Sequence, residues 1–307
     1  MTSNDREKLI KRISWFGILG NGLLSILKIL TGLLAGSMAV IGDGIDSATD
    51  VLTSVITLFT AKISNKSPDM RHPYGYAKAE AIATKALAFI IFFAGAQLFI
   101  STLHKIINNE IQGLPGKLTI YVTIISILGK LVLSIIHFRA AKKANSPMLK
   151  ANGKNMQNDI LISLTVLIGL FFTFILHLAV LDRILALAIS IWIMRSGFQI
   201  FLQDNAELLD GIKDASLYNT VFSAASSVEG VANPHRIRIR QIGNSFLVDL
   251  DIEVRPEMSV NKAHQLAQAV EKKIRDELKN VYDVIVHIEP YGNEEIEKFG
   301  ISREHLK

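Results

Sequence analysis

The sequence predicts an all-α transmembrane domain of six helices, followed by a small α+β domain. Half of the 307 residues are hydrophobic, and the mean hydropathy of +0.33 is high for a soluble protein of this length. Long apolar segments end near residue 207, where shorter segments with mixed polarity begin. We therefore expect a membrane domain over residues 1–207 and a second domain over residues 208–307.

The first domain contains six apolar segments that are each long enough to cross a bilayer. The fifth and sixth are separated only by a short turn near AVLDR. The N-terminal sequence MTSNDREKLIKR is charged and shows no cleavage site of small residues, so we expect no cleavable signal peptide. The segments span about residues 13–36, 38–61, 82–106, 117–139, 148–177 and 181–203.

Basic residues predict the orientation of these segments. Lys and Arg are concentrated in the N-terminal arm and in the second-to-third and fourth-to-fifth connections, whereas the first-to-second connection has none. Both termini are therefore expected in the cytoplasm, with a bacterial inner membrane as the expected location. The net charge of +5 is a topology signal by this interpretation, and nucleic-acid binding is not expected.

The last third of the chain predicts the element order αββαβ. DASLYNTVFSAASSVEGV is expected to be a helix, and RIRIRQI and FLVDLDIEV flank a Gly-Asn turn, which is typical of a hairpin. SVNKAHQLAQAVEKKIRDELKN is an amphipathic helix with Ser259 as its expected N-cap, and VYDVIVHIEP is a third strand. This order predicts helices on one face of a small sheet.

Acidic residues interrupt the apolar segments at helical spacing. Asp46 and Asp50 share one helix face on the second segment, and Asn155 and Asp159 share a face at the start of the fifth. A carboxylate at membrane depth costs several kcal/mol unless something compensates it. Facing helices would supply three carboxylates and one amide, enough oxygen donors for a divalent cation. The alternative for Asn155 and Asp159 is a hydrated helix end with interhelical hydrogen bonds.

Three further charged residues lie in apolar surroundings. Asp43 precedes the acidic pair by one turn, where it can cap, hydrate or relay protons. Lys130, in SILGKLVLS, is expected to pair with Asp43 or with another acid. Lys28 either reaches the membrane surface or pairs with an acid.

The motifs DSATD, NMQND and HPYGYAKAE, together with the C-terminal histidines, resemble the cation diffusion facilitator family over nearly the whole chain. The resemblance implies a homodimeric exporter that exchanges a divalent metal for protons by alternating access, with a metallochaperone-like cytoplasmic domain. It assigns the transport site to Asp46, Asp50, Asn155 and Asp159.

The donor set predicts the metal. Zinc transporters of this family usually carry His where this chain has Asn155, and the chain has no Cys. Carboxylate and carbonyl oxygens favour harder ions, so the site resembles that of the manganese-transporting branch. We expect Mn²⁺, with Fe²⁺, Zn²⁺, Co²⁺ and Cd²⁺ as competitors.

The resemblance also assigns residues outside the membrane. In the loop, Asp69, His72 and Tyr76 match an Asp and two His of a second zinc site; with Tyr in place of His, we expect a weak or absent site and a structural loop that His72 caps. Lys78 and Asp210 match the family's interlock pair. Five residues match the cytoplasmic metal ligands of relatives: His235, Asp251, His264, His287 and Glu289.

Three alternatives remain at this point. One is a zinc or iron exporter of the same family, and another is a membrane-anchored metal sensor that does not transport, although an anchor needs no buried acids. A membrane metalloenzyme is the third, but the apolar segments contain no HExxH motif, and His104, His137 and His177 are isolated. We therefore do not expect an enzyme.

Overall fold

The computed structural model describes residues 3–64, 66–108, 113–203, 205–292 and 299–302. These residues form two compact units. One comprises Met1–Thr60 and Ala83–Leu202, and the other comprises Ala61–Ile82 and Gln203–Lys307. The connection after the second helix therefore belongs to the same unit as the C-terminal domain.

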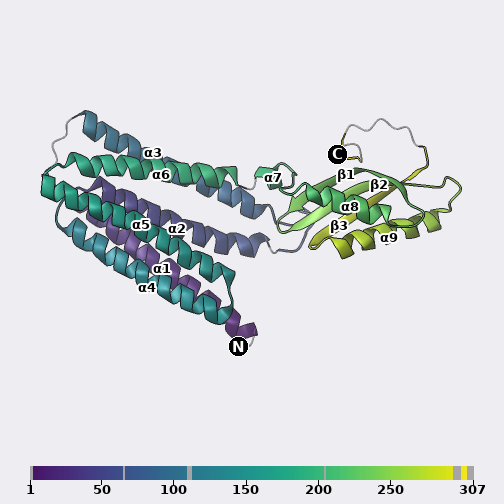
Figure 1. Cartoon of the computed structure of the whole chain (residues 1–307), viewed down its shortest axis with the longest axis horizontal. Coiled ribbons are helices and arrows are strands. Elements are labelled where there is room, and N and C mark those ends of the chain that lie inside the picture. Colours follow the sequence, from purple (N-terminus) through teal and green to yellow (C-terminus); the bar gives the residue numbers. More distant parts are fainter. Residues whose placement is uncertain (1–2, 65, 109–112, 204, 293–298, 303–307) are drawn as a thin grey trace. The chain divides into compact units, whose positions relative to one another are not determined.

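Six long helices form most of the first unit, and each overlaps nearly all of one predicted apolar segment (Figure 1). Five of them are long and apolar enough to span a membrane by length and composition. Among the described long helices, α2 is the one outside this set, and it carries Asp43, Asp46 and Asp50. The helices are α1 (Ser3–Ala35), α2 (Met38–Ser64), α3 (Ala79–Ile107), α4 (Leu118–Ala144), α5 (Pro147–Leu176) and α6 (Val180–Leu202).

Local signals fix the turn between α4 and α5. Asn145 ends α4 in the left-handed conformation, with φ of 44°. Ser146 caps α5 by accepting a hydrogen bond from the backbone nitrogen of Leu149, and Pro147 occupies the first helical position, where its missing N–H is not needed. This short link makes α4 and α5 antiparallel neighbours.

A buried acid, Asp182, holds the start of α2. Its carboxylate accepts hydrogen bonds from the Ser37 hydroxyl at 2.5 Å and from the Met38 backbone nitrogen at 2.8 Å. The first backbone N–H groups of a helix have no partner within the helix, so Asp182 on α6 caps α2 from a distant part of the chain. The sequence pattern suggested only a turn at this position.

The second unit has the predicted order αββαβ. The sheet order is β1-β2-β3, with β1 antiparallel and β3 parallel to β2. Ser259 occupies the N-cap position of α9, but within the described residues its side chain makes no capping hydrogen bond. The elements are α7 (Asn205–Leu208), α8 (Ser216–Ser226), β1 (Ala232–Ile242), β2 (Ser245–Val254), α9 (Val260–Glu277) and β3 (Val281–Pro290).

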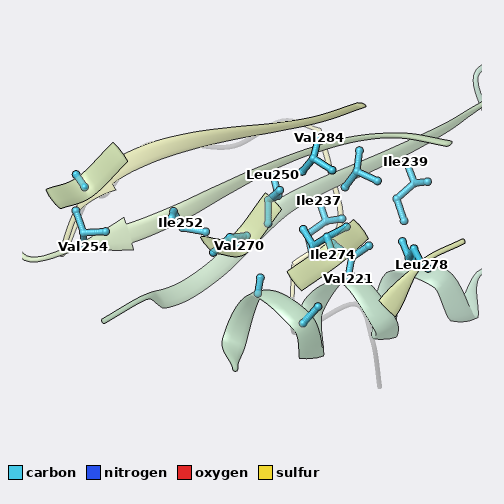
Figure 2. Close-up of a cluster of buried hydrophobic side chains, with 14 residues drawn as sticks. Val221, Ile237, Ile239, Leu250, Ile252, Val254, Val270, Ile274, Leu278 and Val284 are labelled. Carbon is cyan, nitrogen blue, oxygen red and sulfur yellow. The ribbon is translucent and has the colours of Figure 1, made fainter. Parts of the chain in front are cut away.

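The core of this unit lies between the sheet and its helices (Figure 2). Leu250 and Ile252 on β2 pack with Val270 and Ile274 on α9 and with Val221 on α8. Because side chains alternate along a strand, the odd-numbered residues of β2 lie on the opposite face. That face carries the acidic residues considered below.

Candidate metal sites

Three carboxylates meet in the membrane unit. Asp46 and Asp50 on α2 and Asp159 on α5 each offer an oxygen atom, and these atoms all lie within 4.8 Å of one another. Asp46 and Asp159 are buried, and Asp50 is partly buried. Negative charges at this separation repel strongly in a medium of low dielectric constant, so the group is suited to surround a cation. We call these three residues the carboxylate triad.

Asn155, the fourth predicted ligand, is not buried as Asp46 and Asp159 are. It precedes Asp159 by one turn on the same face of α5, as the sequence predicted, but its side chain is exposed.

Lys130 on α4 contacts the triad directly. Its Nζ lies 2.9 Å from Asp159 Oδ2 and donates a hydrogen bond to the Ser47 hydroxyl at 2.9 Å. The Lys130 side chain is fully buried. Lys130 was expected to pair with Asp43 or another acid, and its partner is Asp159.

Asp43 has a different partner, Lys28 on α1. Lys28 Nζ lies 2.9 Å from Asp43 Oδ2, and both side chains are completely buried. The Ser163 hydroxyl donates to Asp43 Oδ1 at 2.9 Å and accepts from Lys28 at 3.0 Å. Ser47 also accepts a hydrogen bond from Lys28, at 3.2 Å, so it contacts both lysines.

The loop between α2 and α3 is closed by Asp69. Its carboxylate accepts hydrogen bonds from the backbone nitrogens of Arg71 and His72 and, at 2.5 Å, from the Tyr76 hydroxyl. The bond from Tyr76, followed by that from the His72 backbone, lowers the pKa of Asp69 to about 2. His72, the residue expected to cap this loop, contributes through its backbone carbonyl, which accepts hydrogen bonds from the backbone nitrogens of Asp69 and Gly75, and its ring nitrogen Nδ1 lies 3.4 Å from Asp69 Oδ1.

The predicted Lys78–Asp210 pair is present within one chain. Lys78 Nζ lies 2.6 Å from Asp210 Oδ1, and the two side chains are 38% and 53% exposed. Both residues belong to the second unit. The contact ties the α2–α3 connection to the segment that follows α7.

A second acidic group lies on the face of the C-terminal sheet opposite the hydrophobic core. His235 on β1, Asp251 on β2 and Glu289 on β3 offer ligand atoms within 4.8 Å of one another. The strand register accounts for this, because His235 is directly opposite Asp251 and cross-strand neighbours lie close together. His235 Nδ1 lies 2.6 Å from the Asn233 carbonyl oxygen, so Nδ1 carries a proton, and Nε2 lies 3.3 Å from Glu289 Oε2.

The other two predicted cytoplasmic ligands are not part of this close group. His287 is 59% exposed, and its Nε2 lies 3.5 Å from Glu289 Oε1. His264 is exposed on α9, the helix that packs on the other face of the sheet. Sequence spacing could not exclude His264 from the group, because it does not report which face of a sheet a helix covers.

Sequence reasoning missed Arg236, whose Nε lies 2.8 Å from Asp251 Oδ2. Burial raises the pKa of Asp251, and the guanidinium group of Arg236 opposes that shift. Irregularities in the β1–β2 register flank His235, and Arg236 has a positive φ of 46°. These departures from regular strand geometry bring His235 and Arg236 to the same acidic group.

The fold and the two acidic groups define a polytopic membrane protein with candidate divalent-metal sites in both units. Residues 14–209 match the family model for the cation efflux transmembrane domain, and residues 214–291 match that for the cation efflux protein cytoplasmic domain. The chain therefore belongs to the cation diffusion facilitator family, as the motifs suggested. It is an integral membrane protein that exports divalent metal cations.

Curated relatives match nearly the full chain. The manganese efflux system protein MneS of Bacillus subtilis is 30% identical over 270 residues, covering 87% of this chain and 91% of the relative. The magnetosome protein MamB of Magnetospira sp. is 27% identical, covering 94% and 98%. Among solved structures, the metal-bound C-terminal domain of the CzcD transporter from Thermotoga maritima is 38% identical, with a TM-score of 0.25 over 26% of this chain and 93% of that one.

Proposed function

We propose that this protein exports Mn²⁺ from the cytoplasm in exchange for protons. The supporting observation is that the carboxylate triad and the neighbouring Asn155 offer only oxygen donors. Imidazole and thiolate ligands favour softer ions, whereas carboxylate and carbonyl oxygens suit Mn²⁺. Two relatives of this chain, MneS and MneP of Bacillus subtilis, are named as manganese efflux system proteins.

The mechanism we propose is alternating access. Mn²⁺ enters from the cytoplasm and binds the oxygens of Asp46, Asp50 and Asp159, with the Asn155 carbonyl and water completing its shell. Helix movement then exposes the ion to the opposite side, where protons compete for the same carboxylate oxygens and release it. The proposed assembly is a homodimer in the bacterial inner membrane, with both termini in the cytoplasm.

The C-terminal domain has a separate proposed role. Its group of His235, Asp251 and Glu289 includes a nitrogen donor and lies outside the helical unit. We propose that this group binds cytoplasmic metal in the dimer, with His264 and His287 as further ligands suggested by family resemblance. Binding there would report the cytoplasmic metal load to the transport domain.

The test is metal uptake by liposomes that contain the purified protein under an imposed pH gradient. The parent should transport Mn²⁺ better than Zn²⁺, Asp50→Ala should abolish transport, and Asn155→His should shift preference toward Zn²⁺. Asp276→Asn, which removes an exposed carboxylate on α9 outside both acidic groups, is the matched control and should transport as the parent does. A parent that prefers Zn²⁺, with Asn155→His unchanged, would leave metal export intact but refute the assignment of Mn²⁺.

A further inference from the structure

The buried lysines near the triad make two separate ion pairs. Lys28 and Asp43 form one ion pair that includes no triad residue. Lys130 instead contacts Asp159, one of the three candidate metal ligands. The two lysines are equally buried and share Ser47 as an acceptor, so they differ chiefly in the acid that each one contacts.

The turn between α4 and α5 explains why Lys130 reaches this carboxylate. Lys130 and Asp159 lie at nearly equal distances along the chain from the link at Asn145 and Ser146. Because the link is short and the two helices are antiparallel, residues equally far from the link lie at the same level along the helix pair. The packing of α4 against α5 therefore brings Lys130 and Asp159 together.

We propose that Lys130 is a built-in counter-cation of the transport site that competes with the metal ion for Asp159. This inference rests on the proposed function of the triad. The Lys130 ammonium group compensates the negative charge of Asp159 before a metal ion binds. When the ion arrives, Lys130 must share or give up that carboxylate. The Ser47 hydroxyl at 2.9 Å remains as a second acceptor, so the ammonium group keeps a hydrogen-bond partner.

The net charge of the site indicates how this competition would serve transport. Three triad carboxylates and one ammonium group carry two formal negative charges, which one divalent cation neutralises. The neighbouring Lys28–Asp43 pair adds no net charge. Without Lys130, the site would hold a divalent ion more tightly than an exporter needs, since the ion must also leave.

Two substitutions at Lys130 should change affinity in opposite directions. Lys130→Met keeps the length of the side chain but removes its charge, so Mn²⁺ should bind roughly tenfold more tightly, with a lower KM and a lower maximal transport rate. Lys130→Arg keeps the charge and offers a bidentate partner to Asp159, so Mn²⁺ should bind more weakly. Lys28→Met, the matched control, should change Mn²⁺ affinity by a smaller factor than Lys130→Met.

The measurements are Mn²⁺ titration of the purified full-length protein by calorimetry and initial transport rates in liposomes. A folded Lys130→Met protein that binds Mn²⁺ as the parent does, or more weakly, would overturn the proposal, because Lys130 would then only offset the burial of Asp159. If Lys130→Met fails to fold, the Mn²⁺ affinity of Lys130→Arg tests the proposal instead. Weaker Mn²⁺ binding than in the parent supports the competition, and unchanged or tighter binding refutes it. A parent that binds neither Mn²⁺ nor Zn²⁺ refutes the proposed function itself.

Discussion

Tyr76 shows how one side chain can convert a potential metal ligand into a structural contact. Its hydroxyl donates to Asp69 Oδ2 at 2.5 Å, while two backbone N–H groups occupy Asp69 Oδ1. Both oxygens of the carboxylate are therefore already used within the loop. A metal ion at this position would have to displace hydrogen bonds that close the turn, which argues for a structural loop.

The hydrogen bond from Tyr76 makes a testable prediction about the pKa of Asp69. Tyr76→Phe should raise that pKa from about 2 toward its ordinary value of 3.8, because the largest cause of the lowering is removed. Since the folded-state pKa is lowered, the ionised carboxylate stabilises the parent loop above the ordinary pKa, and this contribution is lost as pH falls toward 2.

The pKa can be followed by carbon-13 NMR of aspartate-labelled protein. Tyr74→Phe is the control, because the Tyr74 ring lies against Arg240. It should leave the titration of Asp69 unchanged. An unshifted titration in Tyr76→Phe would show that the contacts from Arg71 and His72, without Tyr76, set the pKa of Asp69.

At the scale of helices, Gly44 allows α1 and α2 to approach closely beside the Lys28–Asp43 pair. A methyl group on Gly44 would lie 2.6 Å from Ile29 Cγ1 and 3.0 Å from the Ile29 backbone nitrogen. The Ser25 hydroxyl donates to the Gly44 carbonyl at 2.8 Å, which fixes the same approach. The two helices therefore leave little room for a Cβ at Gly44, next to the buried ion pair.

Gly44→Ala should lower the free energy of unfolding. Overpacking of this kind costs about 1–3 kcal/mol, and the better helix propensity of Ala returns at most about 1 kcal/mol. Gly22→Ala is the matched control, because a methyl group there meets its nearest neighbour, Val51 Cγ1, only at 4.0 Å. Thermal unfolding of the detergent-solubilised variants should show a lower midpoint for Gly44→Ala alone. Equal midpoints would mean that α1 and α2 separate without cost.

The elements themselves were largely predictable, whereas the pairing of charges was not. Apolar length and strand alternation are properties of a single segment, so the six helices and the αββαβ order could be predicted from sequence. The partners of Lys28 and Lys130 depend on how several helices pack. The short Asn145–Ser146 link was a usable signal, since counting outward from it brings Lys130 close to Asp159.

The contact between Arg236 and Asp251 had no comparable signal. It depends on irregularities in the pairing of β1 and β2, which shift His235 and Arg236 relative to regular alternation. The capping of α2 by Asp182 likewise joins residues far apart in sequence. The two acidic groups nevertheless share one feature, which is that a basic side chain contacts one acid of each group. Lys130 contacts Asp159, and Arg236 contacts Asp251.

At the scale of the whole molecule, the Lys78–Asp210 pair is better suited to function than to stability. It is short, at 2.6 Å, but both side chains are substantially exposed. Exposed ion pairs contribute about 0–1 kcal/mol to folding and are weakened by salt. It joins the α2–α3 connection to the segment after α7, so its loss would affect how distant parts of the chain are linked.

We therefore expect Lys78→Gln and Asp210→Asn to lower the transport rate several-fold while changing the unfolding midpoint little. Asn is the suitable replacement at Asp210, because that residue has a positive φ of 57°, a conformation that Asn also tolerates. The double variant should be no slower than either single variant, since each removes the same interaction. Added salt should slow the parent but not the variants. Parent-like transport by both single variants would mean that the pair is only a surface contact, and the interlock suggested by family resemblance would have to be abandoned.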